Sequence, residues 1–148
     1  MIVLLDSGPL GLLTNPKPTP LSVECQRWLA ALWPKEYRVI VPEIADYEVR
    51  RELIRANKTK GIERLNTFKQ NLEYLPLTTP MMLKAAEFWA QARRSGLPTA
   101  DPKALDGDVI LAAQATLAAT GEDPVVVATT NVGHLSRFVD ARRWDAIL

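Results

Sequence analysis

The stretch IVLLDSG occupies residues 2–8 and joins a short apolar run to an abrupt polar end. Four consecutive large apolar residues are typical of a strand buried on both faces, and the polar residues that follow indicate a turn. The stretch PVVVA at residues 124–128 has the same character, and three polar residues follow it as well. Strands that are apolar throughout, rather than alternating, favour a parallel sheet covered on both faces.

Helical patterns separate these strands along the chain. We predict helices at residues 20–33, 42–57, 62–72, 79–96 and 108–119, and further strands at 38–41, 73–77 and 144–147. Residues 15–20 and 97–105 are rich in proline and are expected to be loops. The expected fold class is therefore α/β: a three-layer sandwich with a central, mainly parallel sheet of about five strands flanked by helices. One domain over residues 1–148 accounts for all of these segments.

Two of the predicted helices differ in character. Residues Cys25, Trp28 and Leu32 fall on one side of the first helix, which predicts an amphipathic helix with Cys25 in the core. Residues 108–119 are apolar nearly all round, which predicts a buried helix with Asp106 and Asp108 at its start.

The amino-acid composition limits the metals and partners that this chain can be expected to bind. The 148 residues are 47% hydrophobic and carry a net charge of +1, which gives no strong global attraction to nucleic acid. One histidine, His134, and one cysteine nearly exclude a zinc site, so a metal would be held by carboxylates, as Mg²⁺ or Mn²⁺ are. No apolar run is long enough to span a bilayer, and an acid at position 6 comes too early for a signal peptide. We expect a soluble cytoplasmic protein without a membrane partner.

Each candidate acid also has a structural explanation. Because sites in open parallel sheets form beyond the carboxyl ends of the strands, Asp6 and Asn131 are expected at one edge. Taken alone, Asp6 is equally well a turn or capping residue. Asp106 and Asp108 fit a helix cap and a dipole-favoured acid, although two acids at one helix start repel each other and favour a cation. A helical glutamate such as Glu48 is usually solvated and is no signal by itself.

Four stretches, in this order along the chain, carry a resemblance to a known family. They are IVLLDSGPL at 2–10, VPEIADYEVRREL at 41–53, LDGDVILAAQA at 105–115 and VATTNVGHL at 127–135. Together they resemble the PIN domain, as found in prokaryotic VapC-type toxins. The resemblance covers nearly the whole chain and implies a parallel sheet with acidic or polar residues around Mg²⁺ or Mn²⁺.

Matched residue by residue, the resemblance assigns the catalytic and metal-binding places to Asp6, Glu48 and Asp108. Four more polar residues take auxiliary places: Asp106, Asn131, Ser7 and Thr130. Many family members have aspartate where this chain has Asn131, which leaves open whether one metal or two would bind. Ser7 and Thr130 are expected to orient a carboxylate or to hydrogen-bond a phosphate, or to serve simply as turn residues.

The resemblance also implies an activity and partners. It implies a metal-dependent endoribonuclease that cleaves single-stranded RNA, the toxin of a type II toxin–antitoxin pair, with an antitoxin protein as partner and a homodimeric assembly. Cations cluster around the Glu48 helix and are expected to contact the RNA backbone, although a solvated helix face explains them equally well. They are Arg50, Arg51 and Arg55, with Lys58, Lys60 and Arg64 nearby.

Two other classes of function stay open. A catalytically degenerate PIN-fold binding module is one, with Asn131 as its mark. A receiver-like phosphoacceptor domain that binds Mg²⁺ is the other. The sequence disfavours the receiver because its first strand ends in one acid and no lysine follows Lys103.

Overall fold

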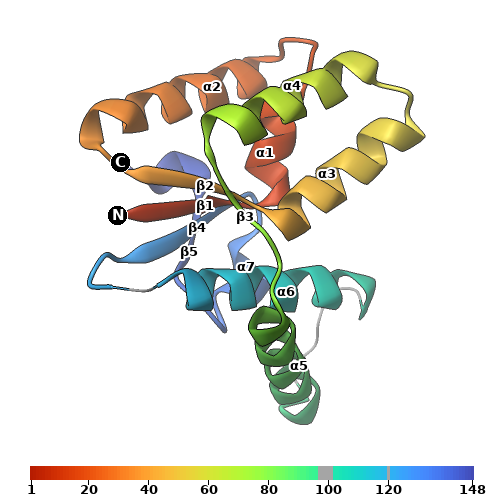
Figure 1. Ribbon diagram of the computed structural model, residues 1–148, viewed down its shortest axis with the longest axis vertical. Helices are drawn as coiled ribbons and strands as arrows, with labels where there is room; N and C mark the ends of the chain where they lie inside the picture. The colour runs from red at the N-terminus through yellow and green to blue at the C-terminus, as the bar shows by residue number, and fades with distance from the viewer. Residues whose placement is uncertain (97–101, 120) are drawn as a thin grey trace.

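The computed structural model of the chain describes residues 1–96, 102–119 and 121–148 (Figure 1). Within these residues, five strands form one parallel sheet in the order β3-β2-β1-β4-β5. The strands are β1 (Ile2–Leu5), β2 (Arg38–Pro42), β3 (Glu73–Leu75), β4 (Val125–Thr129) and β5 (Ala141–Arg143). The predicted parallel sheet is confirmed. Because β1 is central and β3 lies at an edge, the order differs from the 2-1-3-4-5 order of receiver-like folds.

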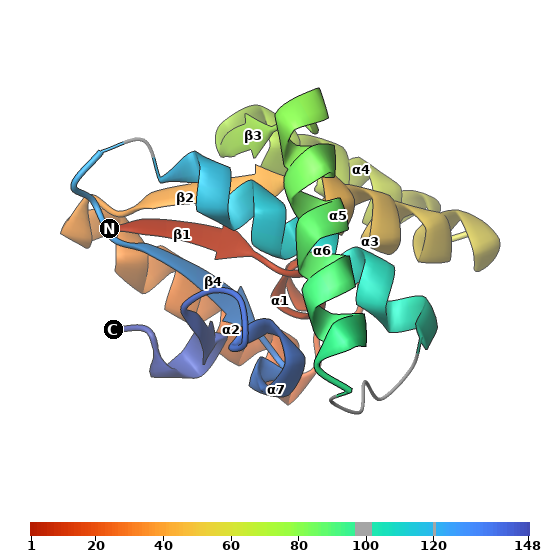
Figure 2. The ribbon, with the colours of Figure 1, turned by 90° about the horizontal axis from the view of Figure 1, so that it is seen from below.

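Helices cover both faces of this sheet and complete the predicted three-layer sandwich (Figure 1). One face carries α1 (Ser7–Thr14), α2 (Pro20–Leu32), α3 (Glu43–Arg55) and α4 (Thr59–Asn71). The other face carries α6 (Pro102–Ala118) and the short α7 (Val132–Leu135). Figure 2 shows that α5 (Thr79–Arg94) lies across α6, away from the sheet. None of the described helices is long and apolar enough to cross a membrane.

The apolar run of β1 is explained by these two layers. Val3 and Leu5 pack in the core under α1 to α4, whereas Ile2 and Leu4 pack in the core under α6 and α7. Since successive side chains of a strand point to opposite faces, a strand covered on both sides has no polar position. The buried, apolar part of this segment therefore ends with β1, and Asp6 is the first polar residue after it.

A buried glutamine ties the two layers together near the sheet edge. Gln114 of α6 is fully buried; its Oε1 accepts from the backbone N–H of Ile44 (3.3 Å), and its Nε2 donates to the carbonyl oxygen of Leu75 (2.9 Å). It thus joins α6 to the start of α3 and to the end of β3. A buried polar side chain is tolerated here because its hydrogen bonds are satisfied.

Three local predictions were wrong. Residues 144–147 do not form a strand: β5 ends at Arg143, and Trp144–Ala146 form a 3₁₀ turn, η2. The reason is packing, because Trp144 meets the Trp28 ring edge-on with centroids 5.7 Å apart, and Trp28 Nε1 donates to the Ile147 carbonyl. The residues after Asp6 are not merely a turn but the helix α1.

The third error concerns the start of α6. This helix begins at Pro102, so residues 102–105 are helical rather than part of a loop; residues 97–101 of the predicted loop lie outside the described part. Proline is favoured in the first turn of a helix, where its missing N–H costs nothing. Asp106 and Asp108 therefore lie inside the helix and not at its cap.

The two hydrogen bonds of the Gln114 side chain lead to a testable prediction about stability. Gln114→Leu keeps the volume but leaves the Ile44 N–H and the Leu75 carbonyl without partners, and we expect the free energy of unfolding in urea to fall by about 2 kcal/mol. Gln91→Leu on the exposed face of α5 is the matched control and should change it by less than about 0.5 kcal/mol. Equal stability of Gln114→Leu and the natural chain would contradict this account.

Candidate active site

The carboxylate of Asp6 is fixed at the end of the central strand. Its Oδ1 accepts from the backbone N–H of Ser7 (2.7 Å), which caps α1, and its Oδ2 accepts from the hydroxyl of Thr129 (2.7 Å). The Asp6 backbone N–H donates to Ala128 (2.9 Å), which continues the pairing of β1 with β4. The geometry of the side chain is therefore set by the sheet itself.

Glu48 and Asp108 approach this point from opposite layers. Glu48 lies on α3 and Asp108 on α6, and both are half-buried. The contact between the helices is close at Gly107, where an added β-carbon would lie 2.8 Å from Glu48 Oε2. The missing side chain at Gly107 therefore lets the Glu48 carboxylate lie against α6, next to Asp108.

Burial and the negative charge of Asp6 raise the pKa values of the other two carboxyl groups. Burial, followed by the charge of Asp6, raises the pKa of Glu48 to about 7, with Asp108 adding to the effect and Arg51 opposing it. Burial and the charge of Asp6 raise the pKa of Asp108 to about 6. Burial also raises the pKa of Asp6, against the hydrogen bonds from Thr129 and Ser7. The structure thus brings the three predicted acids into one electrostatic unit, called here the acid site.

Two further residues that act on Asp108 come from α7 and the residues just after it. His134 and Arg137 both lower the pKa of Asp108, and Arg137 Nη2 lies 3.2 Å from His134 Nδ1. No local sequence pattern placed either residue beside Asp108. Their proximity to Asp108 depends on how α7 packs against α6, which no local pattern indicates.

The predicted auxiliary residues lie outside this unit or at its rim. Asp106 is exposed and lines a separate hollow between α5 and α6, with Met82 and Trp89. The capping explanation for Asp106 and Asp108 is wrong, because the first turn of α6 contains no acid. Asn131 is exposed at the start of α7, and its backbone N–H donates to Thr129 Oγ1 (3.0 Å).

Thr129, not Thr130, is the threonine that orients Asp6. Thr129 is fully buried and donates to the carboxylate, whereas Thr130 is exposed and packs over Gly8, where an added β-carbon would lie 2.5 Å from Thr130 Oγ1. The register of β1 against β4, Leu5 opposite Ala128, sets this choice. The sequence shows that polar residues follow β4, but it does not show the register of β4 against β1, which determines the threonine that meets Asp6.

The three arginines predicted to meet RNA have different surroundings. Arg50 donates to the buried Asp46 (2.9 Å), and Arg55 pairs with Glu52 (2.8 Å). Of the three, Arg51 is the one beside the acid site, with its Nη2 3.9 Å from Glu48 Oε2 and its guanidinium 5.1 Å from the Tyr47 ring centre. It lines a hollow of about 370 Å³ between α1 and α3, named here the α1–α3 groove, which also contains Ser7, Gly11, Thr14 and Glu48.

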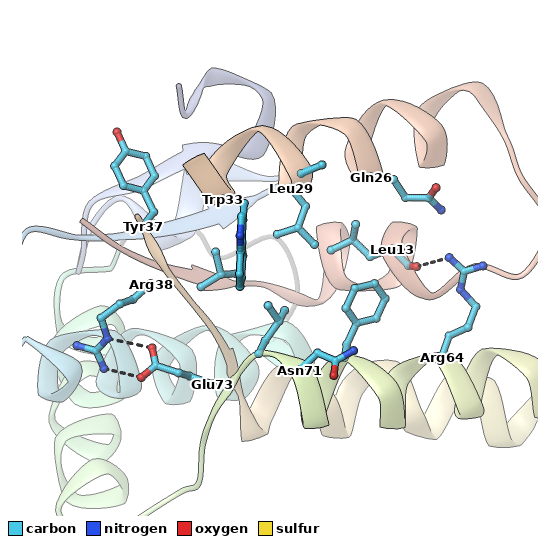
Figure 3. Close-up of a pocket in the computed structure, with 13 residues that line it drawn as sticks. Leu13, Gln26, Leu29, Trp33, Tyr37, Arg38, Arg64, Asn71 and Glu73 are labelled. Atoms are coloured by element: carbon cyan, nitrogen blue, oxygen red, sulfur yellow. Dashed lines mark hydrogen bonds and ion pairs between the residues drawn. The ribbon is translucent and has the colours of Figure 1, made fainter. Parts of the chain in front are cut away.

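A larger, apolar hollow lies between α2 and α4. The α2–α4 groove has a volume of about 780 Å³, and its apolar lining includes Leu13, Leu29, Trp33, Phe68 and Leu72 (Figure 3). Trp33 is 78% exposed at its mouth. Polar groups close both ends: Arg38 pairs with Glu73 (2.9 Å), and Arg64 donates to the Leu13 carbonyl (3.1 Å).

The acid site suits a hard divalent cation by its chemistry. It offers carboxylate oxygens, which Mg²⁺ and Mn²⁺ prefer, and burial and the charge of Asp6 both disfavour the ionised forms of Glu48 and Asp108, an effect that a bound cation would oppose. In the described residues, no three His, Cys, Asp or Glu side chains already stand at metal-binding distances. Binding would therefore draw the carboxylates closer, and Glu48, held by one long ion pair, has the freedom to move.

Comparison with solved structures identifies the architecture as a PIN-like fold. The particular likeness is to chains of VapBC structures. A chain of VapBC2 from Rickettsia felis, bound to a DNA fragment from its promoter, matches with a TM-score of 0.75 and 18% identity over 98% of this chain and 100% of that chain. VapBC-1 from nontypeable Haemophilus influenzae matches at 0.71 and 16%, over 98% and 99%.

DNA-bound VapBC from Salmonella typhimurium matches with a TM-score of 0.66 and 19% identity, over 97% of this chain and 98% of that chain. No family model and no curated protein sequence matches the chain. The resemblance carried by the four sequence stretches is thus confirmed for the fold.

The crowding of carboxylates predicts how stability depends on pH. The folded state holds a proton on Glu48 more tightly than the unfolded chain does, so with chelator present the free energy of unfolding should fall as pH rises from about 4.5 to about 7. Glu48→Gln should remove part of this loss and unfold at higher temperature than the natural chain at pH 8, but not at pH 4. Glu63→Gln, an exposed acid on α4, is the control and should change neither midpoint.

The same experiment with Mn²⁺ in place of chelator should raise the unfolding midpoint at pH 8 more than at pH 5, because protons compete with the metal for the carboxylates. A midpoint that does not respond to Mn²⁺ at either pH would argue against a cation at the acid site.

Proposed function

We propose that this chain is a metal-dependent endoribonuclease that cleaves single-stranded RNA and is the toxin of a type II toxin–antitoxin pair. The observation that carries the proposal is the convergence of Asp6, Glu48 and Asp108 from the end of β1, from α3 and from α6. The PIN-like fold and the likeness to VapBC structures support it.

In this proposal Asp6, Glu48 and Asp108 hold Mg²⁺ or Mn²⁺. The bound cation would supply positive charge to stabilise the transferring phosphoryl group. Thr129 and Ser7 hold the Asp6 carboxylate in place and favour its ionised form, because both donate hydrogen bonds to it. Arg51 balances Glu48 at the edge of the α1–α3 groove, where a phosphate can reach it.

Substitutions within the acid site should act as one unit. Asp6→Asn, Glu48→Gln and Asp108→Asn should each lower cleavage of single-stranded RNA more than about 100-fold, and the double variant Asp6→Asn/Asp108→Asn should be little worse. Asp106→Asn is the matched control: it lies two residues from Asp108 but is exposed in another hollow, and should retain most of the activity.

Cleavage by the purified chain, folded and free of any antitoxin, should stop in EDTA and return with excess Mn²⁺. Full activity in chelator, or activity of both single aspartate variants, would refute the assignment.

Asn131 separates this proposal from a degenerate binding module. Its exposure at the rim fits an auxiliary place rather than a central one. Asn131→Ala should therefore weaken cleavage less than Asp6→Ala does, and Asn131→Asp, which adds a charge, should tighten Mn²⁺ binding and keep activity. A degenerate module would show no cleavage by the natural chain at any metal concentration.

We propose that the antitoxin partner places an apolar segment in the α2–α4 groove. The proposal draws on the VapBC likeness and on the exposed apolar lining, since a concave apolar surface of this size favours a binding role. The predicted homodimer would use another face; α5 offers exposed Met82, Leu83 and Trp89 for it.

The groove assignment can be tested with the product of the neighbouring upstream reading frame. If that protein neutralises the chain, Trp33→Ala should weaken the complex by about tenfold or more, because truncating an aromatic anchor commonly costs over 1 kcal/mol. Ile54→Ala removes another exposed apolar side chain, from α3, and should leave the affinity unchanged. Unchanged binding by Trp33→Ala would place the partner elsewhere.

A further inference from the structure

Eight lysines and arginines of the described residues form ion pairs with carboxylates. The observed pairs are Arg38–Glu73, Arg50–Asp46, Lys69–Asp46, Arg51–Glu48, Arg55–Glu52, Lys84–Glu87, Arg142–Asp140 and Arg143–Asp145. Lys17, Lys58 and Lys60 form no such pair, and unlike the scattered cations that also lack one, such as Arg27 and Arg94, they lie together around one hollow. All three are exposed, and within the described residues no carboxylate lies within ion-pairing distance of them.

These three lysines line one hollow of about 430 Å³, named here the lysine hollow. Two loops form it: Asn15 to Lys17 before α2, and Asn57 to Lys60 where α3 turns into α4. Asn57 adopts a left-handed backbone (φ 55°), which turns the chain sharply. Among the described residues that line the hollow, none is acidic. Three unneutralised positive charges around one concave surface create a local site for anions.

The helix α1 connects the lysine hollow to the acid site. Its first residue, Ser7, contacts Asp6, and its last residue, Thr14, precedes Asn15 of the hollow. The α1–α3 groove follows α1 over this distance, since Ser7, Gly11 and Thr14 all line it, and Thr14 is next in sequence to Asn15 of the lysine hollow. Glu52, which also lines this groove, is paired with Arg55. A β-carbon at Gly11 would meet nothing within 4 Å, so this side of α1 is open. A helix of eight residues spans about 12 Å, which a short stretch of single strand can bridge.

We propose that the α1–α3 groove is the path of the RNA strand and that the lysine hollow holds its backbone phosphates beyond the point of cleavage. The inference rests on the proposed function and names where its substrate is held. A polyanion is repelled by the acid site and gains little from a net charge of +1, so binding requires local cations. The lysine hollow supplies them at the far end of a groove that begins at Glu48 and Arg51.

Binding can be measured without cleavage by fluorescence anisotropy in EDTA, with a fluorescein-labelled single-stranded RNA of random sequence. The variant Lys17→Glu/Lys58→Glu/Lys60→Glu should lose at least about tenfold in affinity. Its slope of log affinity against log salt should become shallower by about 2, since each phosphate contact to a single strand contributes about 0.7. The three lysines replaced by arginine should keep both the affinity and the slope.

The matched control reverses three exposed cations outside the proposed path: Arg27→Glu, Lys35→Glu and Arg94→Glu. It changes the net charge equally and should bind RNA nearly as the natural chain does. Thermal unfolding midpoints of all variants should agree within a few degrees, because the side chains are exposed. Equal loss in the control, or no loss in the hollow variant, would overturn the inference.

The outcome also separates this inference from the proposed function. If the natural chain binds RNA through the lysine hollow but never cleaves it with Mn²⁺, the binding path stands and the nuclease proposal fails. If the natural chain cleaves RNA and the hollow variant binds and cleaves it equally well, the nuclease proposal stands and the path is wrong.

Discussion

The carboxylate of Asp6 accepts hydrogen bonds on both of its oxygens, from the backbone of Ser7 and from the hydroxyl of Thr129. Both donors are provided by the fold: Ser7 begins α1, and Thr129 ends β4 beside the end of β1. Parallel pairing of two strands buried on both faces therefore fixes a charge at the rim of the core. Glu48 and Asp108 are added from the two helical layers, and their charges depend on where Asp6 is held.

This arrangement is expected to lower the stability of the folded chain. Burial raises the pKa values of all three carboxyl groups, the charge of Asp6 raises those of Glu48 and Asp108 further, and protons or a cation must compensate the charges. Arg51 beside Glu48, and His134 and Arg137 beside Asp108, lower these pKa values only in part. Gly107 leaves room for the Glu48 carboxylate because it has no side chain; a β-carbon there would meet Glu48. Such local conflict inside an otherwise consistent fold is expected at a functional site.

The sequence predicted the parts of the fold that depend on burial on both faces. The apolar runs of β1 and β4 and the apolar helix α6 have no other explanation, and their order predicted a parallel sheet. The sequence-based predictions were wrong where tertiary contacts determine the local structure. Trp144 packs on Trp28 instead of extending a strand, and α6 begins at Pro102. Periodicity did not show which way Glu48 points, because that depends on its packing against Gly107. For the same reason the orienting role of Thr129 required the register of β4 against β1.

We infer that Asp6, Glu48 and Asp108 form one cation site. Crystals of the natural chain, grown without antitoxin and soaked in Mn²⁺, can show this through the anomalous scattering of manganese. We expect an anomalous peak bonded to oxygens of these three side chains, which would draw together around it, and no such peak in Asp6→Asn crystals treated in the same way. A natural chain that shows no peak at the acid site in saturating Mn²⁺, or a peak held by other residues, would refute the assignment of this cation site.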